Sequence, residues 1–331
     1  MPLTRKRFLG LAGRGALGAA AYTTFGCFDR SDAGAPPDGK ACPPGTKVSE
    51  LPFNYRGKAV GVRGEITDPL PGKSPDQKPE KISDQAVVTL DQKGGHGEAR
   101  VVDFRVQGIA YVNEAHSLVT GNPDLRIDPR DPTQCQRVFR TVVTATVSGL
   151  EVDGVVRADT IVANLESEQP ETKDIELEML PVGYFANLRI RGYLVDLRYP
   201  ADYLETLRTK RKKSEIDRGI GDEVRKIESE MGAEDGSVCG KHAYPRGLGE
   251  KEYVCSIFSD RSIRAAVKGI PGVSACRGGR IHVDNLGDIY LGQFSVEADL
   301  RKLTMLRVEL ASPPTGRLEF ASVEGDGGRP S

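Results

Sequence analysis

The strongest constraint on the fold is a pair of alternating, β-branched segments joined by Asp153-Gly154. Residues 138–152 alternate between apolar and polar side chains, and residues 155–165 repeat that alternation after the two-residue break. A period of two is the pattern of a strand with one buried face, and Asp-Gly suits a type I′ turn because glycine accepts a positive φ. The sequence therefore predicts a β-hairpin over 138–165 and, with it, an antiparallel sheet.

Further segments of the same kind extend the β prediction along most of the chain. Val102, Phe104 and Val106 alternate with polar neighbours, as expected for a half-buried strand. A turn is predicted at 94–97 and a Pro-rich loop at 68–80. Together with 102–106, the other predicted strands are 58–66, 87–90, 175–180, 188–199, 281–283, 289–296 and 302–310.

Two segments have helical rather than β periodicity. In the first, apolar residues recur at spacings of three and four and form one stripe on a helix: Ile216, Ile220, Val224, Ile227 and Met231. The second is a short helix predicted over 261–268, which Gly269 and Pro271 end.

This order of segments predicts a mainly β protein, an antiparallel β-sandwich with an α-helical insertion near 200–235. The alternative is two small domains, one β and the next α+β. The expected organisation is an export signal at 1–26, a flexible tether at 27–50, a β-rich part at 51–199, the helical insertion at 200–235, a second β-rich part at 236–322 that completes the same fold, and a disordered tail at 323–331.

The N-terminal segment has the build of an export signal. A basic start, with Arg5, Lys6 and Arg7, precedes Phe8-Leu9 and a Gly/Ala-rich run of low hydrophobicity. Residues 4–9 resemble the twin-arginine export signal, whose pattern is Ser/Thr-Arg-Arg-x-Phe-Leu-Lys, although Lys6 replaces the second arginine and Gly10 replaces the lysine. The resemblance implies recognition by an export machinery and passage across a bacterial inner membrane.

The end of that segment has two interpretations. Gly26-Cys27 resembles a lipobox, which implies that lipid is attached to Cys27 and tethers the protein to a membrane. Thr24 stands where the usual leucine would be, so the match is partial. Cleavage by an ordinary signal peptidase after Ala21 is the alternative, and the sequence does not say which membrane would hold the lipid. In both cases the protein is expected in the periplasm or facing the envelope.

Charge and cysteine content narrow the choice of partners. Loss of residues 1–26 removes four basic residues and no acidic one, which leaves a net charge of −5 and argues against nucleic acid as a partner. The six cysteines show no C-x-x-C spacing, so disulfides are the expected use in an exported protein. Cys239 and Cys255 are the favoured pair because a Gly- and Pro-bearing loop separates them.

No local motif points to catalysis, and no cofactor is predicted. Asp124, Asp128 and Asp131 lie in one acidic loop and are candidate Ca²⁺ ligands, but Arg126 and Arg130 stand among them and favour local salt bridges. The four histidines have no paired metal-binding spacing. Glu166, Glu168, Glu171 and Asp174 are read as solvent-facing loop residues.

The sequence therefore predicts an exported, lipid-anchored envelope protein with a non-enzymatic structural, adhesion or binding role. One alternative is an exported hydrolase whose active site is assembled from distant loops. A second alternative is a carrier of a small ligand, which would need a closed barrel with a cavity.

Overall fold

The computed structural model describes most of the chain after residue 52. The described residues are 42, 53–66, 80–106, 108–128, 131–171, 177–197, 209–211, 252–258, 260–275, 279–297, 300–311, 315–326 and 329–330. The predicted export signal, the helix predicted over 214–231 and Cys239 lie outside them. The chain divides into two compact units, Met1–Val48 with Leu125–Cys135 and Ser49–Asp124 with Gln136–Ser331.

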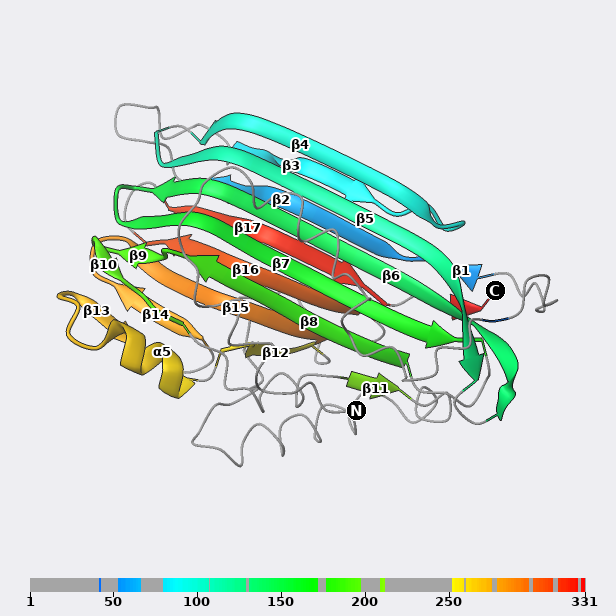
Figure 1. Cartoon of the computed structure of the whole chain (residues 1–331). Coiled ribbons are helices and arrows are strands. Elements are labelled where there is room, and N and C mark those ends of the chain that lie inside the picture. The colour runs from blue at the N-terminus through cyan, green and yellow to red at the C-terminus, as the bar shows by residue number, and fades with distance from the viewer. Residues whose placement is uncertain are drawn as a thin grey trace. The chain divides into compact units, whose positions relative to one another are not determined.

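The second unit is built from two antiparallel sheets, each with eight described strands. We name them after a central strand of each (Figure 1). The β16 sheet has the order β13-β14-β15-β16-β17-β2-β3, with β12 paired to β15. Its strands are β2 (Gly57–Ile66), β3 (Glu80–Thr89), β12 (Glu252–Ser256), β13 (Val273–Ala275), β14 (Arg280–Val283), β15 (Gly287–Glu297), β16 (Leu300–Leu310) and β17 (Gly316–Gly325).

The β6 sheet has the order β10-β9-β7-β6-β5-β4, with β8 paired to both β7 and β11. Its strands are β4 (Gly95–Val106), β5 (Ala110–Asp128), β6 (Asp131–Val152), β7 (Val156–Pro170), β8 (Leu177–Ala186), β9 (Arg189–Ile190), β10 (Tyr193–Leu194) and β11 (Thr209–Arg211). A two-stranded pair of β1 (Phe53–Asn54) and β18 (Arg329–Pro330) and one helix, α5 (Asp260–Val267), complete the described elements.

This architecture confirms the predicted mainly β, sandwich-like fold. The hairpin of β6 and β7 turns at Asp153 (φ 49°) and Gly154 (φ 66°), both left-handed, and Val155 donates a backbone hydrogen bond to the carbonyl of Val152. These are the features of the type I′ turn that Asp-Gly predicts. The short helix predicted over 261–268 is α5, displaced by one residue.

Several predicted boundaries were wrong. The segment 188–199 is not one strand, because left-handed Arg191 and Gly192 form a turn between β9 and β10. β4 already begins at Gly95, where the sequence predicts a turn. The expected disordered tail at 323–331 instead holds the end of β17 and the strand β18, and buried Asp326 bonds to Arg56 Nη1 at 3.2 Å.

A row of unusual backbone conformations crosses the β16 sheet at right angles to its strands. The pairings on either side place Ala86, Gly61, Ala321, Met305 and Gly292 side by side, on five consecutive strands from β3 to β15. Every second member has a left-handed φ: 50° at Ala86, 52° at Ala321 and 59° at Gly292. The pairing register of β17 with β16 and with β2 is the same on both sides of the row, so the row inserts no extra residue there.

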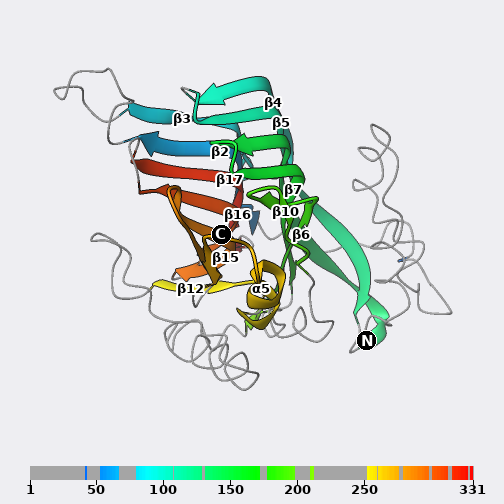
Figure 2. The same cartoon turned by 90° about the vertical axis from the view of Figure 1, so that its left-hand side faces the viewer.

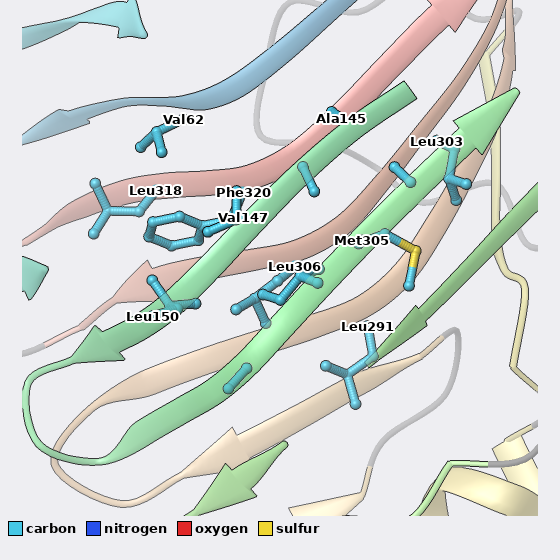
Figure 3. Close-up of a cluster of buried hydrophobic side chains, with 14 of the residues drawn as sticks. Val62, Ala145, Val147, Leu150, Leu291, Leu303, Met305, Leu306, Leu318 and Phe320 are labelled. Atoms are coloured by element: carbon cyan, nitrogen blue, oxygen red, sulfur yellow. The ribbon is translucent and has the colours of Figure 1, made fainter. Parts of the chain in front are cut away.

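The consequence is that core side chains change parity at this row. In β16, Leu306 and Val308 belong to the core on one side of the row, and Met305 and Leu303 belong to it on the other. In β17, the core residues are Leu318 and Phe320 on one side of the row and Val323 on the other. Figure 3 shows Leu303, Met305 and Leu306 gathered in the same apolar cluster. With strict two-residue alternation, Met305 and Leu303 would point away from the core that holds Leu306 and Val308.

The β6 sheet has an equivalent row at Asp103, Asn113, Gly149, Asp159 and Asn187. Asp103, Gly149 and Asn187 have φ values of 51°, 61° and 53°. Because Asp103 lies between Val102 and Phe104, their side chains do not share a face: Phe104 packs against the core, as does Val101, whereas Val102 is 55% exposed. The strand at 102–106 was predicted correctly, but its single buried face was not.

The two sheets pack through small residues. A methyl group on Gly61 of β2 would lie 2.6 Å from Cβ of Ala115 on β5, and one on Gly183 of β8 would meet the side chain of Met305 on β16. β3 and β4, which follow each other in the chain, lie at corresponding edges of the two sheets (Figure 2). The described interior between β2 and β5 is therefore closely packed.

Candidate functional site

The most concentrated group of charges in the described residues lies on three neighbouring strands of the β16 sheet. Glu319 of β17 is 3% exposed and lies opposite Arg63 of β2. Arg63 donates from Nε to Glu319 Oε2 at 2.6 Å, and Lys302 of β16 reaches the same oxygen at 3.4 Å. Arg317 of β17 bonds to the other carboxylate oxygen. One carboxylate therefore joins three cations on β2, β16 and β17.

This arrangement fixes the protonation of Glu319. Burial alone would raise the pKa of its carboxyl group, but the charges of Lys302, Arg63 and Arg317 outweigh burial and hold that pKa well below its usual range. Burial lowers the pKa of Lys302, and the two arginines add to this effect, whereas Glu319 opposes it. Glu319 is therefore a permanent carboxylate and has no proton to donate in a catalytic step.

A second polar group adjoins the cluster along the same sheet. The guanidinium carbon of Arg307 lies 3.8 Å from the ring centroid of Tyr290, within cation–π distance, and Arg307 pairs with Glu309 at 3.1 Å. Tyr290 Oη donates to Glu309 at 3.1 Å. Burial, followed by the charge of Glu309, raises the pKa of Tyr290.

The two groups form a ladder of alternating charges rather than a pocket of one sign. Glu65 lies opposite Arg317, and Glu324 lies opposite Lys302, so carboxylates alternate with cations from strand to strand. Opposite charges on neighbouring strands stabilise strand pairing, whereas a ligand site for an anion would need unbalanced positive charge. The ladder is thus a structural support that gives this face of the β16 sheet a polar, mixed-charge character.

The candidate Ca²⁺ ligands do not lie in a loop as predicted. Asp124 and Asp128 are in β5, and Asp131 is the first residue of β6, so the three carboxylates belong to the ends of two strands. Within the part of the chain that the structure describes, no three His, Cys, Asp or Glu side chains are placed to hold a metal ion.

Residues 166–170 of the predicted acidic loop are instead the end of β7; Glu171 follows the strand, and Asp174 lies outside the described residues. Glu166 and Glu168 alternate with Ser167, which is buried, so the acidic side chains stand on the opposite face of the strand. Arg140 of β6 bonds to Glu166 at 2.5 Å and approaches Glu168 at 3.8 Å. Cross-strand pairing explains a run of glutamates that composition alone assigns to a loop.

A disulfide joins Cys42 to Cys135, with a sequence separation of 93 residues. The sequence did not suggest this pair, because spacing carries no signal for residues so far apart. The prediction of a Cys239–Cys255 bond is untested, because Cys239 lies outside the described residues. Cys42 falls in the segment predicted to be a tether, so the bond fixes that segment to β6 at one point.

None of the helices within the described ranges has the length and apolar character needed to cross a membrane.

Comparison with known proteins gives a family but no function. Residues 53–297 match the family described as "Domain of unknown function (DUF8256)". The chain belongs to this family. No curated protein and no solved structure matches it. The matched segment ends with β15, yet β16 and β17 lie between β15 and β2 in the sheet, so the fold of this chain needs residues beyond the match.

Proposed function

We propose that this member of the DUF8256 family is exported, anchored by lipid on Cys27, and serves a non-enzymatic structural, adhesion or binding role in the cell envelope. The observation that carries the proposal is the Cys42–Cys135 disulfide. Disulfides form and persist in oxidising compartments outside the cytoplasm, which is where the basic N-terminal segment with its twin-arginine-like residues 4–9 would deliver the chain.

The non-enzymatic part of the proposal rests on the charged ladder. Glu319 is held ionised by three cations and Glu309 pairs with Arg307, so neither of these carboxylates is an unpaired base and Glu319 is not a general acid. Close contact between the sheets at Gly61 and Ala115 argues against the small-ligand carrier, which needs a cavity. The hydrolase alternative has no specific observation in its favour.

Cell fractionation tests the anchoring. The wild-type chain should be found in the membrane fraction, and Cys27→Ser should move it to the soluble exported fraction while leaving its amount within twofold. Cys276→Ser is the matched control and should stay with the membrane. A Cys27→Ser protein that remains membrane-bound would contradict lipid anchoring.

Export is tested separately at the basic start of the chain. Replacing Arg5 and Lys6 together by Gln should retain the full-length precursor in the cytoplasm. Arg14→Gln, which removes one charge outside the motif, should be exported as the wild type is. If the variant with Arg5 and Lys6 replaced is exported as well as Arg14→Gln is, recognition through residues 4–9 is contradicted.

A further inference from the structure

The disulfide creates a second covalent route from the N-terminal segment into the folded unit. One route continues along the chain from Cys42 to β1 at Phe53. The other crosses the disulfide to Cys135, which lies in β6. Cys42 comes only 15 residues after Cys27, so along the chain an anchor on Cys27 would reach the disulfide before the first described strand, β1.

The two routes end in very different strands. β1 has two residues, which pair with Pro330 and Arg329 of β18. β6 has 22 residues, lies between β5 and β7, and is paired with β7 from Val138 to Val152. A load on β1 therefore meets one short pairing, whereas a load on β6 meets the long ladder with β7 and the pairing with β5.

The direction of load adds to this difference. Antiparallel hydrogen bonds run perpendicular to the strands, so a pull along a strand strains many of them together, whereas a two-residue strand is released by breaking one pair. Cys135 is near the start of β6, and the Asp153-Gly154 turn is at its far end. Ala186, the last residue of β8, pairs with Thr160 of β7 near that turn, so a pull between Cys135 and Ala186 acts along the strands and shears the β6–β7 and β7–β8 ladders.

We propose that the Cys42–Cys135 disulfide is a mechanical clamp, which transfers load from the anchored N-terminal segment directly to β6 and bypasses residues 43–134. The proposal rests on the proposed anchoring at Cys27 for its biological setting. The clamp itself is a property of the folded chain and is tested without lipid.

The experiment is single-molecule stretching of the chain from residue 27 onward, carrying Cys27→Ser to prevent lipidation. One handle is attached at the N-terminus and the other at a short tag inserted after Ala186, at the end of β8. Molecules are stretched oxidised, and again after folding and reduction with dithiothreitol. Reduction in place avoids relying on a variant that fails to fold.

The clamp predicts two changes on reduction. The force of the first rupture falls by at least twofold, because β1 rather than β6 is loaded. The final extension rises by about 320 Å, because the 93-residue separation is released at roughly 3.4 Å per residue. Cys42→Ser with Cys135→Ser should behave like the reduced protein, and Cys276→Ser, the matched control, like the oxidised wild type.

Equal rupture forces before and after reduction, accompanied by the 320 Å change, would overturn the clamp while confirming the bond. Absence of the length change would overturn it because the bond does not form. Failure of the proposed function would be seen in cell fractionation, where Cys27→Ser would stay in the membrane fraction. That result would leave the rupture forces unaffected.

Discussion

The closest approach of the two sheets gives a sharp test of how they are packed. Gly61 of β2 faces Ala115 of β5, and a methyl group at position 61 would lie 2.6 Å from the Ala115 methyl and 3.1 Å from that of Ala86. Ordinary contacts of this kind are 3.4–4 Å. Neither alanine has a rotamer with which to move away, so the sheets would have to separate by roughly 1 Å. Overpacking of this kind costs about 1–3 kcal/mol.

The complementary change is Ala115→Gly, which removes a fully buried methyl group. It should cost about 1–2 kcal/mol, from about 0.8 kcal/mol of lost burial and the conformational freedom of glycine in a strand. In the double variant, the methyl at position 61 takes the space left at 115. We therefore expect its stability to be close to that of Ala115→Gly alone, so the coupling energy should cancel the cost of Gly61→Ala, at about 1–3 kcal/mol in favour of the double variant.

Equilibrium unfolding in urea, with the disulfide intact, measures all four proteins of the cycle. Gly61→Ala combined with Ala158→Gly is the control, because Ala158 lies on β7 and is buried in the same core without facing Gly61. That pair should be additive within about 0.5 kcal/mol. Additivity of Gly61→Ala with Ala115→Gly would show that the two residues do not meet, and would refute the packing of β2 on β5.

Three further predictions concern the charged ladder, a buried hydroxyl and the disulfide. Glu319→Gln should cost about 1–3 kcal/mol at pH 7, because it removes the buried carboxylate that three partly exposed cations share. Since the pKa of Glu319 is lowered in the folded state, the stability advantage of the wild type should be present above the usual value of about 4.5 and be lost as the pH falls further below it. The control is Glu65→Gln, which changes an exposed side chain and should alter stability by less than about 0.5 kcal/mol at all pH values. Tyr55 Oη is buried without a hydrogen-bond partner in the described structure, and burial, opposed by Arg137, raises the pKa of Tyr55 to about 12. Tyr55→Phe should therefore unfold at an equal or higher urea concentration at pH 7, and should not show the loss of stability that the wild type shows between pH 10 and 12. Replacing Cys42 and Cys135 by Ser should lower the free energy of unfolding by about 4–5 kcal/mol in the chain-entropy treatment, and a loss below about 1 kcal/mol in urea unfolding would contradict that estimate.

The fold class could be predicted because its signals are local. The β6–β7 hairpin follows from alternation and from one Asp-Gly turn, and α5 follows from a short helical segment that ends at Gly269. The face of each strand could not be predicted across the transverse rows. Ala86 and Ala321 adopt left-handed φ within strands, and nothing in their local sequence marks them, because alanine has no preference for that region.

The candidate site was also beyond the reach of the sequence. Arg63 and Glu319 are 256 residues apart and meet only because β17 pairs with β2. Cys42 and Cys135 are likewise brought together by the fold and not by spacing. In contrast, the polar run at 166–171 was visible in the sequence but misread, because the arginine that pairs with it, Arg140, lies on the neighbouring strand.

The central claim is that this protein is exported and held at a membrane by lipid on Cys27. Intact mass and N-terminal peptide mass of the protein purified from the membrane fraction test it directly. The account predicts a chain that begins at Cys27 with a diacylglyceryl group on that residue, and a Cys42–Cys135 bond that opens on reduction. An unmodified chain that begins at Tyr22, or one that retains residues 1–26, would contradict it.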